Sequence, residues 1–81
     1  MLSFKTVKSP NGKYNEIQIA CDRKGMAILI GTLAELVGEA ASHRHLRSPA
    51  AGGTELDPTT PWGEEADVCE VIITYDEAGS N

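Results

Sequence analysis

Apolar and polar residues alternate along two short segments at the start of the chain, residues 2–8 and 15–21. A period of two is typical of a β-strand with one buried face. The proposed buried sides are Leu2, Phe4 and Thr6 in the first segment and Ile17, Ile19 and Cys21 in the second. The sequence between them, Ser9-Pro10-Asn11-Gly12-Lys13, contains an Asn-Gly pair suited to a tight turn and a proline that interrupts a strand. The chain is therefore predicted to open with a β-hairpin.

The spacing of apolar residues becomes helical after Asp22. An aspartate there can cap a helix, because its carboxylate accepts a backbone N–H bond and suits the positive end of the helix dipole. Seven apolar residues then recur at the i, i+3, i+4, i+7 spacing of one helix face: Met26, Leu29, Ile30, Leu33, Leu36, Val37 and Ala40. We expect an amphipathic helix that packs this stripe against the sheet.

A ridge of small residues, Ala27, Gly31, Ala34 and Gly38, lies beside the apolar stripe. Each glycine inside a helix costs roughly 1 kcal/mol relative to alanine. Close approach of another backbone is a physical reason to tolerate that cost. The approaching backbone can belong to this chain's own sheet or to a second protomer, and we favour the sheet.

Two more strands are predicted in the second half of the chain, at residues 43–47 and 67–75. In the first, Leu46 should face the core and His43 and His45 the opposite side. In the last, the expected faces are Cys69, Val71, Ile73 and Tyr75 on one side and Val68, Glu70, Ile72 and Thr74 on the other. This alternation predicts that each strand has one face in contact with the core.

The segment between these strands, residues 48–66, is long, irregular and rich in proline and glycine. Connections of this kind are usually functional or mobile. The polar tail, residues 77–81, is expected to fray. Together the elements predict a single α+β domain over residues 1–81, in the order β-β-α-β-β. One amphipathic helix should pack on one face of a small antiparallel sheet.

Charge is distributed unevenly around the net value of −5. All seven basic residues lie in the first 47 positions, whereas eight of the twelve acidic residues lie after them. An acidic half repels nucleic acid and attracts basic surfaces, so a basic protein is the better candidate partner. The alternative is that the acids only keep a small domain soluble. With no apolar run near the ~20 residues that span a bilayer and no signal-peptide pattern, we expect a cytoplasmic protein without membrane contact.

The two cysteines and two histidines form a nominal Cys2His2 set of metal ligands. Cys21 and Cys69 are 48 positions apart, whereas structural zinc sites draw ligands from short paired spacings. The strand alternation also places His43 and His45 away from the cysteines. We therefore predict no metal or other cofactor, two reduced and buried cysteines, and a polar surface patch around the histidines. Without an activated nucleophile pair or a phosphate-binding loop, the chain is not expected to be an enzyme.

Trp62, the only tryptophan, lies on the long connection within an acidic stretch. Tryptophan is enriched at the centres of protein interfaces. We predict that the partner-facing residues are Trp62, Glu64, Glu65 and Asp67, with His43 and His45 as second choices. The alternative is that Trp62 folds back and covers one end of the core.

The order of these features resembles immunity protein family 32 of bacterial polymorphic-toxin systems. The resemblance covers roughly residues 15–76: a strand ending near Asp22, a helix start around Gly25, a leucine-rich helix, the motif His43-x-His45-Leu46, an acidic connection and a last apolar strand. It departs from the family at Arg44 and in the length of the connection. The resemblance implies a non-catalytic protein that binds and neutralises a co-encoded toxin, which we expect to be basic.

A different class of function is the alternative, a small homo-oligomeric domain with a structural or regulatory role. Such a homodimer would use the small-residue ridge of the helix or the apolar residues of an open sheet face, namely Val7, Ala20, Val68 and Ile72. The sequence leaves both classes open.

Overall fold

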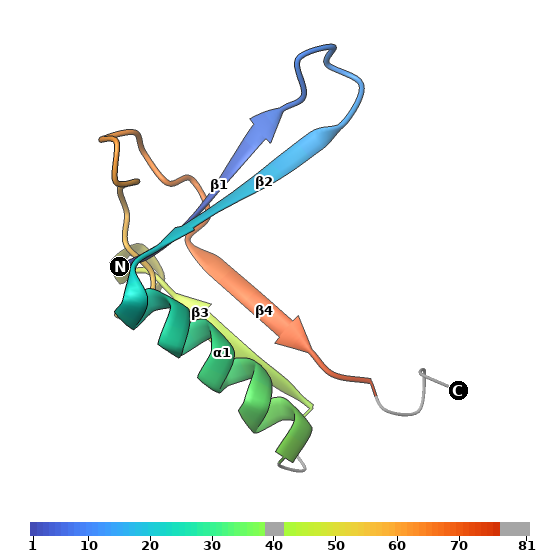
Figure 1. Cartoon of the computed structure of the whole chain (residues 1–81), viewed down its shortest axis with the longest axis vertical. Coiled ribbons are helices and arrows are strands. Elements are labelled where there is room, and N and C mark those ends of the chain that lie inside the picture. The colour runs from blue at the N-terminus through green and yellow to red at the C-terminus, as the bar shows by residue number, and fades with distance from the viewer. Residues whose placement is uncertain (39–41, 77–81) are drawn as a thin grey trace.

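The computed structural model describes residues 1–38 and 42–76, and contains the predicted order of elements (Figure 1). The elements are β1 (Leu2–Lys8), β2 (Asn15–Cys21), α1 (Arg23–Gly38), β3 (His43–Arg47), the 3-10 turn η1 (Pro49–Ala51) and β4 (Glu70–Thr74). The α+β class and the β-β-α-β-β order are confirmed. The sheet is divided into two antiparallel pairs, β1 with β2 and β3 with β4. The predictions for Ala40 and for residues 77–81 lie outside the described residues.

The opening hairpin forms as predicted, but most of it extends beyond the core (Figure 1). The turn is closed by Ser9, whose N–H donates to the Tyr14 carbonyl at 2.9 Å, and Gly12 adopts a positive φ of 70°. Phe4 pairs with Ile19 across the strands, so both share one face. Phe4 is buried, whereas Ile17 and Ile19 are 65% and 52% exposed. The prediction that these isoleucines are buried is therefore wrong.

The core lies where the two strand pairs and the helix meet. Its buried residues are Leu2, Phe4, Leu46 and Leu56, and half-buried Leu29, Val68, Val71 and Ile73 pack against them. Leu56 comes from the long connection, which also covers the free edge of β1. The N–H of Asp57 donates to the Leu2 carbonyl at 2.7 Å, and the Leu2 N–H donates to the Asp57 carboxylate at 2.9 Å. The connection is thus part of the folded structure.

Helix α1 begins at the predicted cap, since the N–H of Gly25 donates to Asp22 Oδ1 at 2.9 Å. Its predicted apolar stripe is split, however. Leu36 is buried and Leu29 half-buried, while four other members of the stripe are exposed: Met26, Ile30, Leu33 and Val37. The helix contacts the rest of the fold along only one edge of its apolar surface.

The small-residue ridge does not contact the sheet. A Cβ atom added at Gly31 or Gly38 would meet nothing within 4 Å in the described part of the chain. The favoured interpretation of the ridge, close approach of the sheet, is therefore wrong. Gly25 is the glycine at a close approach, because a Cβ there would lie 1.8 Å from the Met1 carbonyl oxygen.

The last strand, β4, is shorter than predicted. In the residues just before it, the side chains that face the core differ from the predicted ones. Within β4, Val71 and Ile73 pack on the core and Ile72 is exposed, as expected. Ahead of the strand, Val68 packs on the core and Cys69 is exposed, the reverse of the prediction. The Val68 N–H bonds to the Phe4 carbonyl at 3.3 Å, and the Cys69 carbonyl accepts a bond from the Ser48 N–H at 2.9 Å. These bonds to different neighbours interrupt the regular alternation. Cys21 is half-buried, so neither cysteine is fully buried as predicted.

Candidate partner-binding site

Trp62 lies at the tip of a small ordered turn in the long connection. The turn is closed by a bridge between Thr59 and Glu65. The Thr60 N–H donates to the Glu64 carbonyl at 2.8 Å, and the Glu64 N–H donates back to the Thr60 hydroxyl at 3.0 Å. Gly63 takes a φ of 87°, a conformation that glycine adopts without steric strain. Since Thr60 is buried, the turn is anchored and presents Trp62 outward.

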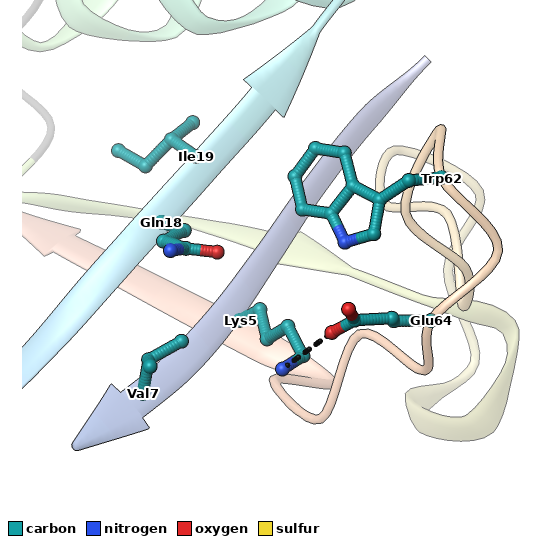
Figure 2. A pocket seen from close by; sticks show the side chains of 6 residues that line it. All are labelled: Lys5, Val7, Gln18, Ile19, Trp62 and Glu64. Atoms are coloured by element: carbon teal, nitrogen blue, oxygen red, sulfur yellow. Dashed lines mark ion pairs between the residues drawn. The ribbon is translucent and has the colours of Figure 1, made fainter.

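Trp62 is 54% exposed and borders an open hollow of about 590 Å³. Figure 2 shows the tryptophan beside β1, close to Glu64 and above the strands of the hairpin. Lys5 and Gln18 are cross-strand partners on this face of the hairpin, and Val7 lies on the same face. Ile19, which follows Gln18 and belongs to the face of Phe4, also borders the hollow. Trp62 therefore does not cover the core, which lies on the opposite face with Phe4. The side chain forms one wall of a surface hollow.

An ion pair crosses this hollow, between Lys5 Nζ and Glu64 Oε2 at 2.9 Å (Figure 2). The hydrogen bond from Lys5 lowers the pKa of Glu64, and the indole of Trp62 adds to this effect. The same bond raises the pKa of Lys5. Both groups are therefore charged at neutral pH. The hollow combines an aromatic wall, the aliphatic side chains of Val7 and Ile19, and a pair of opposite charges.

The other two predicted acids have different surroundings. Glu65 is exposed on the turn, next to Glu64. Asp67 accepts a hydrogen bond from the Thr6 N–H at 2.8 Å and another from the Thr6 hydroxyl. These bonds, that of the hydroxyl first, lower the pKa of Asp67. Its carboxylate therefore attaches the connection to β1, close to the hollow.

The histidines lie on the other strand pair, so the structure does not place them at this hollow. His43 and His45 project from the outer face of β3, and their rings meet edge to face with centroids 5.1 Å apart. His45 Nδ1 is 3.4 Å from Glu70 Oε2, and Arg47 bonds to the same carboxylate. Arg47 is the main cause of the lowered pKa of Glu70. This is the polar surface patch that the strand alternation predicted.

Four residues of the hollow were not predicted from the sequence: Lys5, Val7, Gln18 and Ile19. They belong to β1 and β2, more than 40 positions before Trp62. The available signal was the alternation of the hairpin, which places Lys5 and Val7 together on the face opposite Phe4. Nothing in the local pattern indicated that the connection would return to this face.

No group of three or more His, Cys, Asp or Glu side chains suited to a metal ion occurs among residues 1–38 and 42–76. Over the same residues, no helix is long and apolar enough to cross a membrane. The hollow around Trp62 is the candidate site. Comparison with known proteins found no matching family model, no matching curated protein and no matching solved structure.

Proposed function

We propose that this chain is a non-catalytic, cytoplasmic binding protein that neutralises a co-encoded bacterial toxin by forming a complex with it. The observation that carries the proposal is the presentation of Trp62. Large aromatic side chains contribute most of the binding energy in many interfaces, particularly where they are held rigidly before the partner arrives. Trp62 is more than half exposed on an anchored turn, and it borders a hollow that can accept a partner side chain.

The charges around the hollow favour a basic partner. Glu64 and Glu65 are adjacent on the turn, and the region after position 47 contains no basic residue. A partner arginine can stack on the indole face by a cation–π contact while its guanidinium approaches Glu64. Opposite charges on two proteins also accelerate their encounter. A basic toxin is the partner that this chemistry suits.

The resemblance to immunity protein family 32 supports the same proposal from the sequence. Its sharpest element, His43-x-His45-Leu46, forms β3, in which Leu46 is buried and His43 is exposed. The histidines face away from the core on a separate strand pair. In this proposal they form a secondary contact, and the hollow at Trp62 forms the primary one.

The test is co-expression with the product of the adjacent open reading frame. The expected result is that the neighbour alone stops growth, and that this chain restores growth and co-purifies with it. Replacing Trp62 with alanine should weaken the complex by at least ~2 kcal/mol, about 30-fold in Kd, since a hot-spot tryptophan is removed. Titration calorimetry of the purified pair measures this loss.

Tyr14→Ala is the matched control, because Tyr14 is also an exposed aromatic residue, at 57%, but lies in the hairpin turn and does not line the hollow. It should leave both rescue and Kd unchanged. If the product of the adjacent open reading frame is harmless and does not co-purify with this chain, the proposed neutralisation of a toxin is wrong. If both substitutions weaken the complex equally, Trp62 is not the specific binding residue that we propose.

A further inference from the structure

Helix α1 has an outward face that nothing in the described structure covers. Four aliphatic side chains form this face at the spacing i, i+4, i+7, i+11, one residue out of step with the buried Gly25 and Leu36. Their exposed fractions are 51% for Met26, 59% for Ile30, 45% for Leu33 and 70% for Val37. An exposed apolar surface of this kind, continuous along a helix, is typical of a contact site.

The small-residue ridge extends this face around the helix. At 100° per residue, Ala27, Gly31, Ala34 and Gly38 follow directly after Met26 and Ile30, and Arg23, in the first turn, is the one charged side chain of α1 between the two rows. The space above Gly31 and Gly38 is open. A second helix can therefore approach the α1 backbone closely along the ridge, with its side chains packed between those of the exposed row.

The accessible area of the chain is larger than that of a compact monomer of its mass. The whole chain exposes 5587 Å². A compact monomer of its mass, 8.6 kDa, exposes about 4,700 Å². The difference of about 900 Å² comes from all the surfaces that the fold leaves uncovered, among them the hairpin beyond the core and the outward face of α1.

We propose that a second copy of this chain covers the outward face of α1, with the two helices packed antiparallel about a two-fold axis. This face suits a second copy, because an antiparallel two-fold contact pairs the first turn of each helix with the last turn of the other. The two Arg23 side chains then lie at opposite ends of the contact, without like-charge repulsion. The helix ends are complementary in this arrangement. The first turn contains Arg23 and Lys24 and no acid, and the last turn contains no basic residue. Antiparallel packing places the basic first turn of each helix beside the negative carbonyl end of the other.

The test is the mass in solution, measured by sedimentation and light scattering from about 1 to 300 µM, the range over which a moderate dimer dissociates. The expected mass is twice that of the 8.6 kDa chain. Ile30→Glu should weaken the dimer by at least about 100-fold, since each substitution counts twice across a two-fold axis. Ile72→Glu, which places the same charge on a similarly exposed isoleucine of β4, should leave the dimer intact.

A second variant separates loss of contact from loss of folding. Gly31→Leu adds a side chain in open space and improves helix propensity, so the folded chain should be at least as stable as the original. In the dimer the same leucine occupies the close-approach ridge and should produce monomers. A monomer at every concentration overturns the proposal, as does a dimer that persists in both Ile30→Glu and Gly31→Leu. The inference is independent of toxin binding, which co-expression measures separately.

Discussion

The two apolar faces of α1 have similar residues and different surroundings. The inner face, with Leu29 and Leu36, packs towards the core, whereas the outer face, with Ile30 and Leu33, is exposed. The two rows are offset by one residue, and the sequence does not distinguish them. Apolar periodicity shows which surface of a helix avoids water, but the helix needs an opposing surface to cover it. In this chain the opposing surface is narrower than the apolar stripe.

The largest expected effect comes from truncating one leucine on each face. Leu36→Ala should lower the free energy of unfolding by about 2–5 kcal/mol, because Leu36 is 2% exposed and its loss leaves a cavity. Leu33→Ala, at a side chain that is 45% exposed, should change it by less than about 1 kcal/mol. Urea unfolding followed by circular dichroism measures both, at a dilution where light scattering gives the mass of one chain. Equal losses would mean that the helix packs through a different face.

Two glycines provide a second comparison, with effects of opposite sign. Gly25→Ala should destabilise the fold by about 1–3 kcal/mol, because the added Cβ would lie 1.8 Å from the Met1 carbonyl oxygen and force the backbone to move. Gly31→Ala should stabilise the diluted monomer by up to about 1 kcal/mol, since the new methyl group meets open space and alanine favours the helix. The same urea unfolding experiment shows whether each substitution raises or lowers the free energy of unfolding. A destabilising Gly31→Ala would show that this ridge is occupied within one chain.

The smallest expected effect is on the pH dependence of stability. It concerns the edge of β1, where carboxylates of the long connection bond to residues of the strand. The pKa values of Glu64 and Asp67 are lowered in the folded chain, by Lys5 and by Thr6 respectively. A carboxyl group with a lowered pKa stabilises the fold above its usual value and loses that contribution as the pH falls through the folded value. The thermal unfolding midpoint should therefore decrease as the pH is lowered from about 5 to about 3.

Asp67→Asn is the control for this pH dependence, because the amide cannot titrate and its NH₂ group cannot accept a bond. Its midpoint should be lower at neutral pH and should change less on acidification than that of the original chain. A midpoint that is constant down to about pH 3 would show that these carboxylates do not contribute to holding the edge.

Much of the local structure was predictable from the chain alone. The Asp22 cap, the turn at Gly12 and the alternation that buries Leu46 while Ile72 faces outward depend on residues close together in sequence, and all were confirmed. The candidate site was only partly predictable. Trp62 and Glu64 were identified from composition, whereas Lys5 and Gln18 reach the hollow through strand pairing and the path of a long connection.

The sequence by itself determined the element types and their order, since periodicity, capping and turn chemistry involve neighbouring residues. The tertiary structure decided which apolar faces are covered, that Leu56 enters the core and that Trp62 borders an open hollow. These outcomes depend on contacts between distant positions, such as the bond from Thr6 to Asp67 across 61 residues. Such contacts form only where the backbone path and the remaining packing bring the groups together, and no local pattern contains that information.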